Sequence, residues 1–222
     1  MQFLRPAEAT ALVVNAAPHI QPLLIFLIGT GARMAEALEL DWADVDLSGR
    51  RAVVWQKQGD ERHIDLPPVV VGALAAIETR TGRVFRPVRS RSPKGATCGK
   101  EVGESYYNTN RTGGGQIKKA WATACRKAGF SGRDRIWIPK GGNAEKVQFV
   151  PDITPHALRH TFATWHYCIH KDLLRLKEDG GWRTITMVTR YAKKMPDGYR
   201  AEILDWLEGN CAEMVHINRS SR

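Results

Sequence analysis

Apolar residues recur along the chain at the spacing of one helix face, with polar residues between them. In the first such stretch Ala9, Leu12, Val13 and Ala16 follow this spacing after a Pro–Ala–Glu opening, which is typical of a helix start. The run 23–28 is almost entirely apolar, which indicates a helix buried on nearly all sides. The start of this second helix is bracketed by Pro18 and Pro22. The pattern further predicts helices over residues 5–17, 33–40, 69–80, 116–129, 155–168, 171–178, 184–191 and 197–208.

Short strand-like runs interrupt the helices in two places. Residues 51–57 and 62–67 flank the tight-turn composition QGDE, and together they predict a hairpin with Lys57 at its tip. Residues 135–150 form two short runs around a Gly–Gly–Asn segment, which predicts a second hairpin. Residues 83–115 are rich in Arg, Ser, Gly, Pro, Lys and Thr and are predicted to form a loop or a poorly ordered segment. The expected fold is mainly α with a small antiparallel β-sheet, the α+β class.

The composition indicates a soluble protein. A length of 222 residues with 43% hydrophobic content suits one sizeable domain or two small ones with a true core. Glu8 interrupts the N-terminal region, so no signal peptide is predicted. The longest apolar run, residues 23–29, is too short to cross a bilayer. The expected location is cytoplasmic, with association to the nucleoid if the source is bacterial.

The net charge indicates the class of partner, and the cysteine spacing indicates the state of the thiols. The formal net charge of +10 and the pI near 9.7 favour a polyanionic partner, nucleic acid first, over a protein that is merely basic. Cys98, Cys125, Cys168 and Cys211 lie far apart and form no CxxC pair. They are predicted to be reduced thiols rather than a disulfide frame or a zinc site.

Candidate chemistry gathers first in the stretch TPHALRHTFATW. This stretch places His156, Arg159 and His160 on the first turns of a predicted helix. His156 and His160 stand four positions apart, as do His166 and His170, which is the spacing of a zinc-binding pair on a helix. No Glu follows the first His, no third ligand is evident, and Arg159 would repel a cation. No metal and no other cofactor is therefore expected.

Two further stretches add candidate residues. In GTGARMAEALEL, Arg33 follows a glycine-rich turn and Glu36 lies three residues on, hence on the same helix face. In GGWRTITMVTRYAKK, Trp182 follows a Gly–Gly break and Tyr191 comes nine residues later among basic residues. Each feature alone has an ordinary explanation: a surface ion pair, a core tryptophan, a packed tyrosine with a solvated hydroxyl. Only their joint order and spacing point to one site.

Taken together, these stretches resemble the catalytic domain of the tyrosine recombinases, the phage integrase family, from about residue 4 to about residue 208. The resemblance implies that family's fold. It also implies one catalytic domain over 1–222, without the N-terminal DNA-clamping domain usual in the family and with a flexible tail over 209–222. Glu36 matches the acidic residue that supports the first catalytic arginine. By the same resemblance the catalytic residues are Arg33, Lys57, His156, Arg159, Trp182 and Tyr191.

The implied chemistry explains why these residue types occur together. A phosphodiester under attack spreads negative charge over its non-bridging oxygens, so an enzyme without a metal must supply cations and donors there. Arg33 and Arg159 each offer a rigid fork that matches phosphate oxygens, and the indole N–H of Trp182 is a further donor. This position holds His in most members of the family and Trp in some.

The nucleophile implied by the resemblance is Tyr191. A free tyrosine has a pKa near 10, so nearby cations are expected to favour the phenolate, and His156 is expected to help move the proton. Attack on phosphorus would give a 3′-phosphotyrosyl intermediate without ATP. Lys57 is the candidate acid for the departing 5′ oxygen. His160 is expected to pack or to form a hydrogen bond beneath the site.

The implied partner is double-stranded DNA, bound by a homo-oligomer that is a tetrameric synapse by family resemblance. Several basic residues are candidates for contacts with backbone phosphates, although each also suits a solvated surface. They are Arg83, Arg86, Arg89, Arg91, Lys94, Lys118 and Lys119.

The expected function is a site-specific recombinase or integrase that breaks and rejoins DNA. Two alternatives remain open at this point. One is a relaxing enzyme similar to the type IB topoisomerases, with the same chemistry and no strand exchange. The other is a DNA-binding module of the same fold whose tyrosine no longer cleaves.

Overall fold

The computed structural model describes residues 2–55, 60–90, 100–102, 106, 117–138, 144–191 and 197–210. Its helices are α1 (Pro6–Val14), α2 (Gln21–Thr30), α3 (Met34–Glu39), α4 (Pro68–Ala75), α5 (Lys118–Lys127), α6 (His156–His170), α7 (Leu173–Gly180), α8 (Thr186–Thr189) and α9 (Arg200–Glu208). Short 3-10 turns occur at η1 (Pro18–Ile20), η2 (Trp42–Asp44) and η4 (Asp197–Tyr199). The strands are β1 (Val45–Asp46), β2 (Arg51–Trp55), β3 (Glu61–Asp65), β4 (Val88–Ser90), β5 (Lys100–Val102), β6 (Gly132–Trp137) and β7 (Lys146–Pro151).

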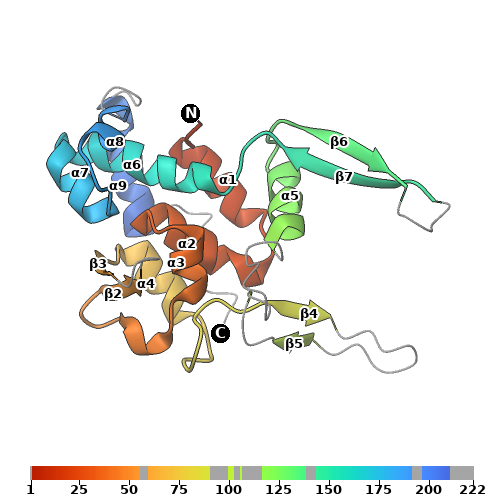
Figure 1. Ribbon diagram of the computed structural model, residues 1–222, viewed down its shortest axis with the longest axis horizontal. Helices are drawn as coiled ribbons and strands as arrows, with labels where there is room; N and C mark the ends of the chain where they lie inside the picture. Colours follow the sequence, from red (N-terminus) through yellow and green to blue (C-terminus); the bar gives the residue numbers. More distant parts are fainter. Residues whose placement is uncertain are drawn as a thin grey trace.

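Helix α2 forms the centre of the core. Every residue from Leu23 to Thr30 is buried, and the helix packs against α1, α4 and α6 (Figure 1). Pro22 stands in its first turn, where a missing backbone N–H costs nothing. The helix ends at Gly31, whose φ of 63° lies in the left-handed region that favours glycine. A Cβ atom on Gly31 would also come within 2.2 Å of the ring of Phe162, so both conformation and space require glycine here.

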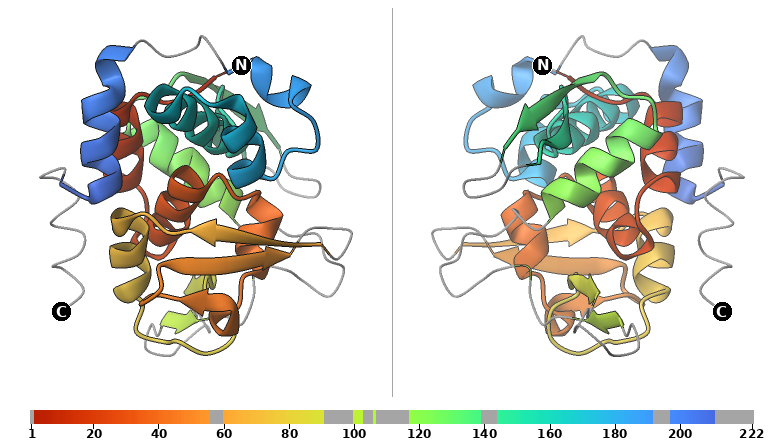
Figure 2. Two further views of the ribbon diagram at one scale, coloured as in Figure 1. Left: turned by 90° about the vertical axis from the view of Figure 1, so that its left-hand side faces the viewer. Right: turned by 90° about the vertical axis from the view of Figure 1, so that its right-hand side faces the viewer.

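The three-stranded sheet covers one side of the helical body, as Figure 2 shows. Its strands run in the order β1-β2-β3 and are antiparallel, with Val54 of β2 paired to Arg62 of β3. Burial alternates along both long strands, as expected for a sheet with one face on the core. Ala52, Val54 and Ile64 fill the buried face. Arg62 shares that face and is buried too, which is unusual for a guanidinium.

Both predicted hairpin regions contain antiparallel strands. The second one, β6–β7, projects from the body beside α5 (Figure 1). The prediction of a loop over 83–115 is partly wrong, because β4 pairs with β5 within it. Strands of three residues are too short to show an alternating pattern, so the sequence gives no signal for this pair.

The predicted helices and the α+β class are confirmed, with shifted boundaries. Helix α6 continues two residues beyond the predicted end, to His170, and then stops at Lys171, which has a φ of 54°. Helix α8 is shorter than the predicted 184–191 and covers only Thr186–Thr189. Cys125 and Cys168 are both buried. Within the described part of the chain, no helix has the length and apolar character needed to span a membrane.

Candidate active site

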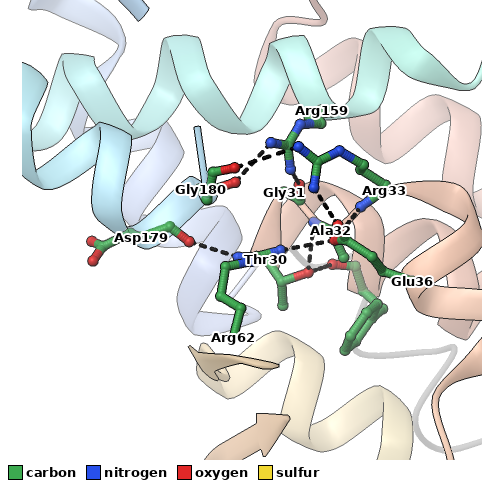
Figure 3. Close-up of polar contacts among 11 residues, drawn as sticks. Thr30, Gly31, Ala32, Arg33, Glu36, Arg62, Arg159, Asp179 and Gly180 are labelled. Atoms are coloured by element: carbon green, nitrogen blue, oxygen red, sulfur yellow. Dashed lines mark hydrogen bonds and ion pairs between the residues drawn. The ribbon is translucent and has the colours of Figure 1, made fainter. Parts of the chain in front are cut away.

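The C-terminal end of α7 gathers three arginines from three different segments. Its last backbone carbonyls, at residues 179–181, each accept a hydrogen bond from one guanidinium (Figure 3). Arg62 donates to the first carbonyl at 2.7 Å, Arg159 to the second at 2.7 Å, and Arg33 to the third at 3.4 Å. The last carbonyls of a helix lack partners within the helix and carry partial negative charge. The end of α7 is therefore a suitable anchor for cations.

Glu36 supplies the negative charge between two of these arginines. One of its carboxylate oxygens pairs with the Arg33 guanidinium, and the other accepts from Arg62 Nη2 at 3.0 Å and from the Arg33 backbone N–H at 2.9 Å. This side chain is only 4% exposed. Burial alone would raise the pKa of Glu36, but the backbone N–H of Arg33 and the charge of Arg62 bring it below its ordinary value. Glu36 is thus ionised and fixes both guanidiniums.

Arg159 is the most enclosed cation of the group. Its residue is 4% exposed, and besides the bond to α7 it donates to the Gly31 carbonyl through Nη1. Its guanidinium lies over the ring of Trp182, 4.1 Å from the ring centroid. Burial, and after it the positive charges of Arg33 and Arg62, lower the pKa of Arg159 to about 9. Arg159 therefore still carries its charge at pH 7. Two described bonds use two of the five N–H groups of a guanidinium.

The position of the Trp182 ring requires a glycine at residue 180. The Trp182 ring packs so closely on Gly180 that a Cβ atom there would lie 1.7 Å from a ring atom. Gly181 follows in the left-handed conformation, with a φ of 64°, and turns the chain after α7. These two glycines form the Gly–Gly break seen in the sequence. On the other side, the Trp182 ring stands 5.8 Å from the ring of Tyr191, between centroids.

Tyr191 is buried in the same cluster and is 2% exposed. Its hydroxyl oxygen lies 2.8 Å from Nδ1 of His160, and the His160 ring is edge-on to that of His156 at 4.6 Å between centroids. Burial raises the pKa of Tyr191, against the opposing effects of Arg190 and Arg159. The expected effect of the cations is present, but the net shift of the pKa is upward. Their effect has the expected direction, but removal of the hydroxyl from water is the larger effect.

Both histidines at the start of α6 favour the neutral form. Burial, followed by the charge of the neighbouring His156 and of Arg190, lowers the pKa of His160 to about 4. Burial together with Arg159 and Arg33 lowers the pKa of His156. At pH 7 each imidazole therefore keeps one unprotonated ring nitrogen. His160, rather than His156, is the histidine whose ring nitrogen contacts the Tyr191 hydroxyl.

The remaining predicted site residues differ in how far the structure describes them. Lys57, Arg91 and Lys94 lie outside the described residues, and for Arg89 only the backbone pairing in β4 is described. Arg83 donates a hydrogen bond to the backbone carbonyl of Glu39. Arg86 donates to the backbone carbonyls of Thr81 and Arg83. Lys118 and Lys119 are exposed in the first turn of α5.

Arg62 is the member of the cluster that the sequence analysis missed. It alternates in step with Ile64 on the buried face of β3, so its position in the strand predicts an inward side chain. A buried arginine needs an acidic partner, and that requirement was the available signal. The partner, Glu36, lies 26 residues away in the sequence, which is why only the fold reveals the pair.

The other two histidines of the zinc-like spacing belong to a separate network. His166 Nε2 lies 2.8 Å from Asp179 Oδ2, and that oxygen also accepts from Arg175 Nε at 3.3 Å. His170 Nδ1 lies 3.2 Å from Arg175 Nη1. In the described ranges, no group of three or more His, Cys, Asp or Glu side chains is placed to hold a metal ion.

A cavity of about 360 Å³ adjoins this network rather than the arginine cluster. It is lined by Ile64, Phe162, His166, Asp179 and Leu207 among others. Neither arginine of the predicted catalytic set lines it, and Tyr191 does not either. The cluster around Tyr191, not the cavity, is the candidate active site.

Sequence comparison places the chain among known proteins. The model of the phage integrase family matches residues 2–197. The integrase of Salmonella phage P22 is 24% identical over 201 residues, which is 89% of this chain and 45% of that protein. The tyrosine recombinase XerC of Bifidobacterium longum (strain DJO10A) is 30% identical over 169 residues, 76% of this chain and 41% of that protein. The chain thus spans less than half the length of these relatives.

Comparison with solved structures gives the same fold. The XerA recombinase matches with a TM-score of 0.59 and 21% identity, over 91% of this chain and 62% of that one. A XerH site-specific recombinase bound to palindromic difH substrate in a post-cleavage complex matches with a TM-score of 0.53 and 18% identity, over 86% of this chain and 49% of that one. At these identities the likeness concerns the fold.

Proposed function

Because the chain belongs to the phage integrase family, we propose that it is a tyrosine-type DNA strand transferase, a site-specific recombinase or integrase that acts on double-stranded DNA. The observation that carries the proposal is the position of Tyr191. Its hydroxyl contacts His160, and its ring adjoins Trp182, which in turn covers the Arg159 guanidinium. A nucleophile, a proton acceptor and fixed cations therefore lie in one cluster.

Arg33 and Arg159 would bind the scissile phosphate. The Arg33 side chain is 43% exposed, so part of its guanidinium faces solvent and can receive a phosphate oxygen. The Arg159 guanidinium donates one hydrogen bond to the carbonyl of Gly31 and one to that of Gly180. Its other N–H groups are not used by these two bonds. Donors fixed before the reaction stabilise developing charge without reorganisation. Glu36 and α7 provide that fixation.

The chemical step would be a direct displacement at phosphorus. The Tyr191 hydroxyl oxygen forms a bond to phosphorus while the bond from phosphorus to the 5′ oxygen breaks. The tyrosine proton passes to Nδ1 of His160, and Lys57 supplies a proton to the departing 5′ oxygen. The product is a 3′-phosphotyrosyl intermediate and a free 5′ hydroxyl. Reversal with another 5′ hydroxyl rejoins the strand, so neither a metal ion nor ATP is required.

The proposed partner is duplex DNA, and the proposed assembly is a homo-oligomer, tetrameric at the point of strand exchange. A net charge of +10 supports a polyanionic partner. The XerH protein of the same fold was solved on its difH substrate, which supports this class of ligand. The basic residues from 83 to 119 are proposed to contact backbone phosphates of the DNA, and Lys57 is proposed to lie near the cleaved strand.

A nicked suicide substrate tests the proposal. The probe is a labelled duplex with randomised sequence around a nick, so that a cleaved strand loses its short fragment and cannot be rejoined. Incubation in EDTA followed by denaturing electrophoresis should show a covalent adduct of protein and label. Tyr191→Phe should abolish it, because the phenylalanine ring lacks the attacking oxygen.

Tyr199→Phe is the matched control, since Tyr199 packs on the core away from the cluster around Tyr191. This variant should form the adduct at the wild-type rate. The absence of any adduct at high protein concentration would overturn the proposal in favour of a non-cleaving binder. Relaxation of supercoiled DNA without exchange between two duplexes would point instead to a topoisomerase-like enzyme.

A further inference from the structure

The β6–β7 hairpin has two chemically different faces. Residues paired directly across an antiparallel ladder point to the same side of the sheet. One face therefore carries the pairs Asp134–Phe149 and Ile136–Val147. The other face, called here the outer face, carries Arg133–Val150, Arg135–Gln148 and Trp137–Lys146.

The Asp134–Phe149 pair of the first face rests on α5, whereas Ile136 and Val147, farther along the hairpin, are exposed. Arg126 of α5 donates to both carboxylate oxygens of Asp134, at 3.0 and 2.8 Å. The same guanidinium lies 5.1 Å from the centroid of the Phe149 ring. Because successive side chains of a strand point to opposite sides, the outer face is directed away from α5. Figure 1 shows the hairpin extending beyond α5, away from the helical body.

The outer face concentrates positive charge without neutralising it. Arg133, Arg135 and Lys146 are all exposed, and none of its six residues is acidic. None of the three cations forms an ion pair with another described residue, whereas the one acid in these two strands, Asp134, is paired on the opposite face. The exposed Trp137 pairs with Lys146 at the last position of the ladder and follows Arg135 by two residues. The three cations and Trp137 are thus open to solvent, whereas Gln148 and Val150 of the same face are partly buried.

We propose that the outer face of the β6–β7 hairpin binds the phosphate backbone of duplex DNA. Charge complementarity selects this occupant, because DNA presents one negative charge about every 1.7 Å of helix axis. Arginine forks match phosphate oxygens in pairs. A protein partner fits less well, since three cations without ion pairs would be costly to bury in a protein–protein interface.

The position of the hairpin in the chain agrees with this role. Strand β7 ends at Pro151, and α6 begins at His156 with the cluster that contains Arg159. The hairpin therefore starts beside the candidate active site. Six strand residues extend about 20 Å, which corresponds to about six base pairs of duplex at 3.4 Å each. DNA held at Arg33 and Arg159 would thus pass along the hairpin. In this respect the inference rests on the proposed function.

The test compares the salt dependence of DNA affinity in two matched variants. In the first, Arg133→Gln and Arg135→Gln remove two charges from the outer face. In the control, Arg50→Gln and Arg200→Gln remove two charges from exposed residues before β2 and at the start of α9. Fluorescence anisotropy with a labelled 30-base-pair duplex gives the affinity at several KCl concentrations.

Each lost phosphate contact reduces the slope of log affinity against log salt by about 0.9. The outer-face variant should therefore bind less tightly at low salt and lose about two units of slope, while the control keeps the wild-type slope. Thermal unfolding should be unchanged in both variants, because neither pair of side chains has a packing role. A wild-type slope in the outer-face variant would overturn the proposal. Altered self-association with an unaltered slope would overturn it as well and would identify a protein contact.

This outcome is separate from that of the adduct assay. A chain that forms no adduct with Tyr191 but shows the slope change fails as a strand transferase and still binds DNA through the hairpin. A chain that forms the adduct with an unchanged slope keeps the proposed function and loses this inference.

Discussion

Nδ1 of His160 lies 2.8 Å from the hydroxyl oxygen of Tyr191, across 31 residues of sequence. The contact joins the first turns of α6 to the segment after α8. His156, one turn earlier on α6, touches the ring of His160 rather than the tyrosine. His160 is therefore the histidine in contact with the hydroxyl, and His156 lies behind it. The i,i+4 spacing alone does not show which of the two contacts the hydroxyl.

Replacement of His160 by phenylalanine should slow cleavage and leave DNA binding intact. The ring volume is retained, but no nitrogen remains to accept the Tyr191 proton. Positioned acid–base groups contribute about 10²–10⁴-fold, so the single-turnover rate of adduct formation should fall at least a hundredfold at pH 7. His170→Phe at the far end of α6 should stay within a few-fold of wild type. An unchanged rate in His160→Phe would exclude His160 as the proton acceptor.

Stability should fall on acidification because of two histidines in α6. Burial first, and then neighbouring positive charges, lower the pKa of His160 and of His170 to about 4. The unfolded chain, with pKa values near 6.5, binds these protons first as the pH falls. Stability from the neutral forms is thus fully present above pH 6.5 and is lost as the pH falls toward 4. Urea unfolding between pH 4 and pH 7.5 measures this dependence.

The variant His160→Phe provides the internal comparison for that experiment. The slope of the unfolding free energy against pH measures how many protons are taken up on unfolding. In this pH range the variant should take up as much as one proton fewer than the wild type, since one titrating group is removed. The slope from His170 remains. A slope identical to that of the wild type would contradict the lowered pKa of His160.

Glu36→Gln should destabilise the fold strongly. The change removes the one carboxylate between Arg33 and Arg62, and leaves the buried Arg62 without a counter-charge. Breaking a buried pair from one side costs about 3–5 kcal/mol. Urea unfolding at pH 7 measures the loss. Asp65→Asn is the control, because its pair with Arg51 is solvent-exposed and should be worth less than about 1 kcal/mol. Equal effects of the two substitutions would contradict the structural role of Glu36.

Gly180→Ala should displace Trp182. The added methyl group would lie 1.7 Å from the indole, so the ring must leave the Arg159 guanidinium. Overpacking of this kind costs about 1–3 kcal/mol, and adduct formation should fall more than tenfold because Arg159 loses its cover. Gly198→Ala is the matched control, since a Cβ atom there meets nothing within 4 Å. Near-ultraviolet circular dichroism reports the tryptophan environment, and an unchanged spectrum in Gly180→Ala would refute this packing.

Much of the fold could be predicted because its signals are local. The apolar period gives the helices, and the left-handed glycine at Gly31 marks the end of α2. The pairing of β4 with β5 could not be predicted, because strands of three residues carry too little alternation. The extents of α6 and α8 depend on tertiary packing, which overrides local preference at helix ends.

The sequence predicted the residues of the candidate site and two of their contacts, Arg33 with Glu36 and a hydrogen bond of His160, but not the others. The motifs supply Arg33, Arg159, Trp182 and Tyr191, and the structure brings these four together. Their contacts cross long stretches of sequence and depend on backbone carbonyls, which a motif does not show. The same limit hid Arg62, whose partner Glu36 lies on another element. The direction of the Tyr191 pKa shift likewise depends on burial, which is a property of the folded chain.

The carbonyls at the end of α7 have a consequence for synthesis. The three guanidiniums they hold lie 148, 117 and 21 residues before their acceptors in the sequence. A ribosome therefore delivers all three arginines well before the residues that align them. Until α7 has emerged from the ribosome, the nascent chain lacks the carbonyls that position these three side chains. A product of premature termination upstream of residue 179 would carry these three arginines without the carbonyls that align them.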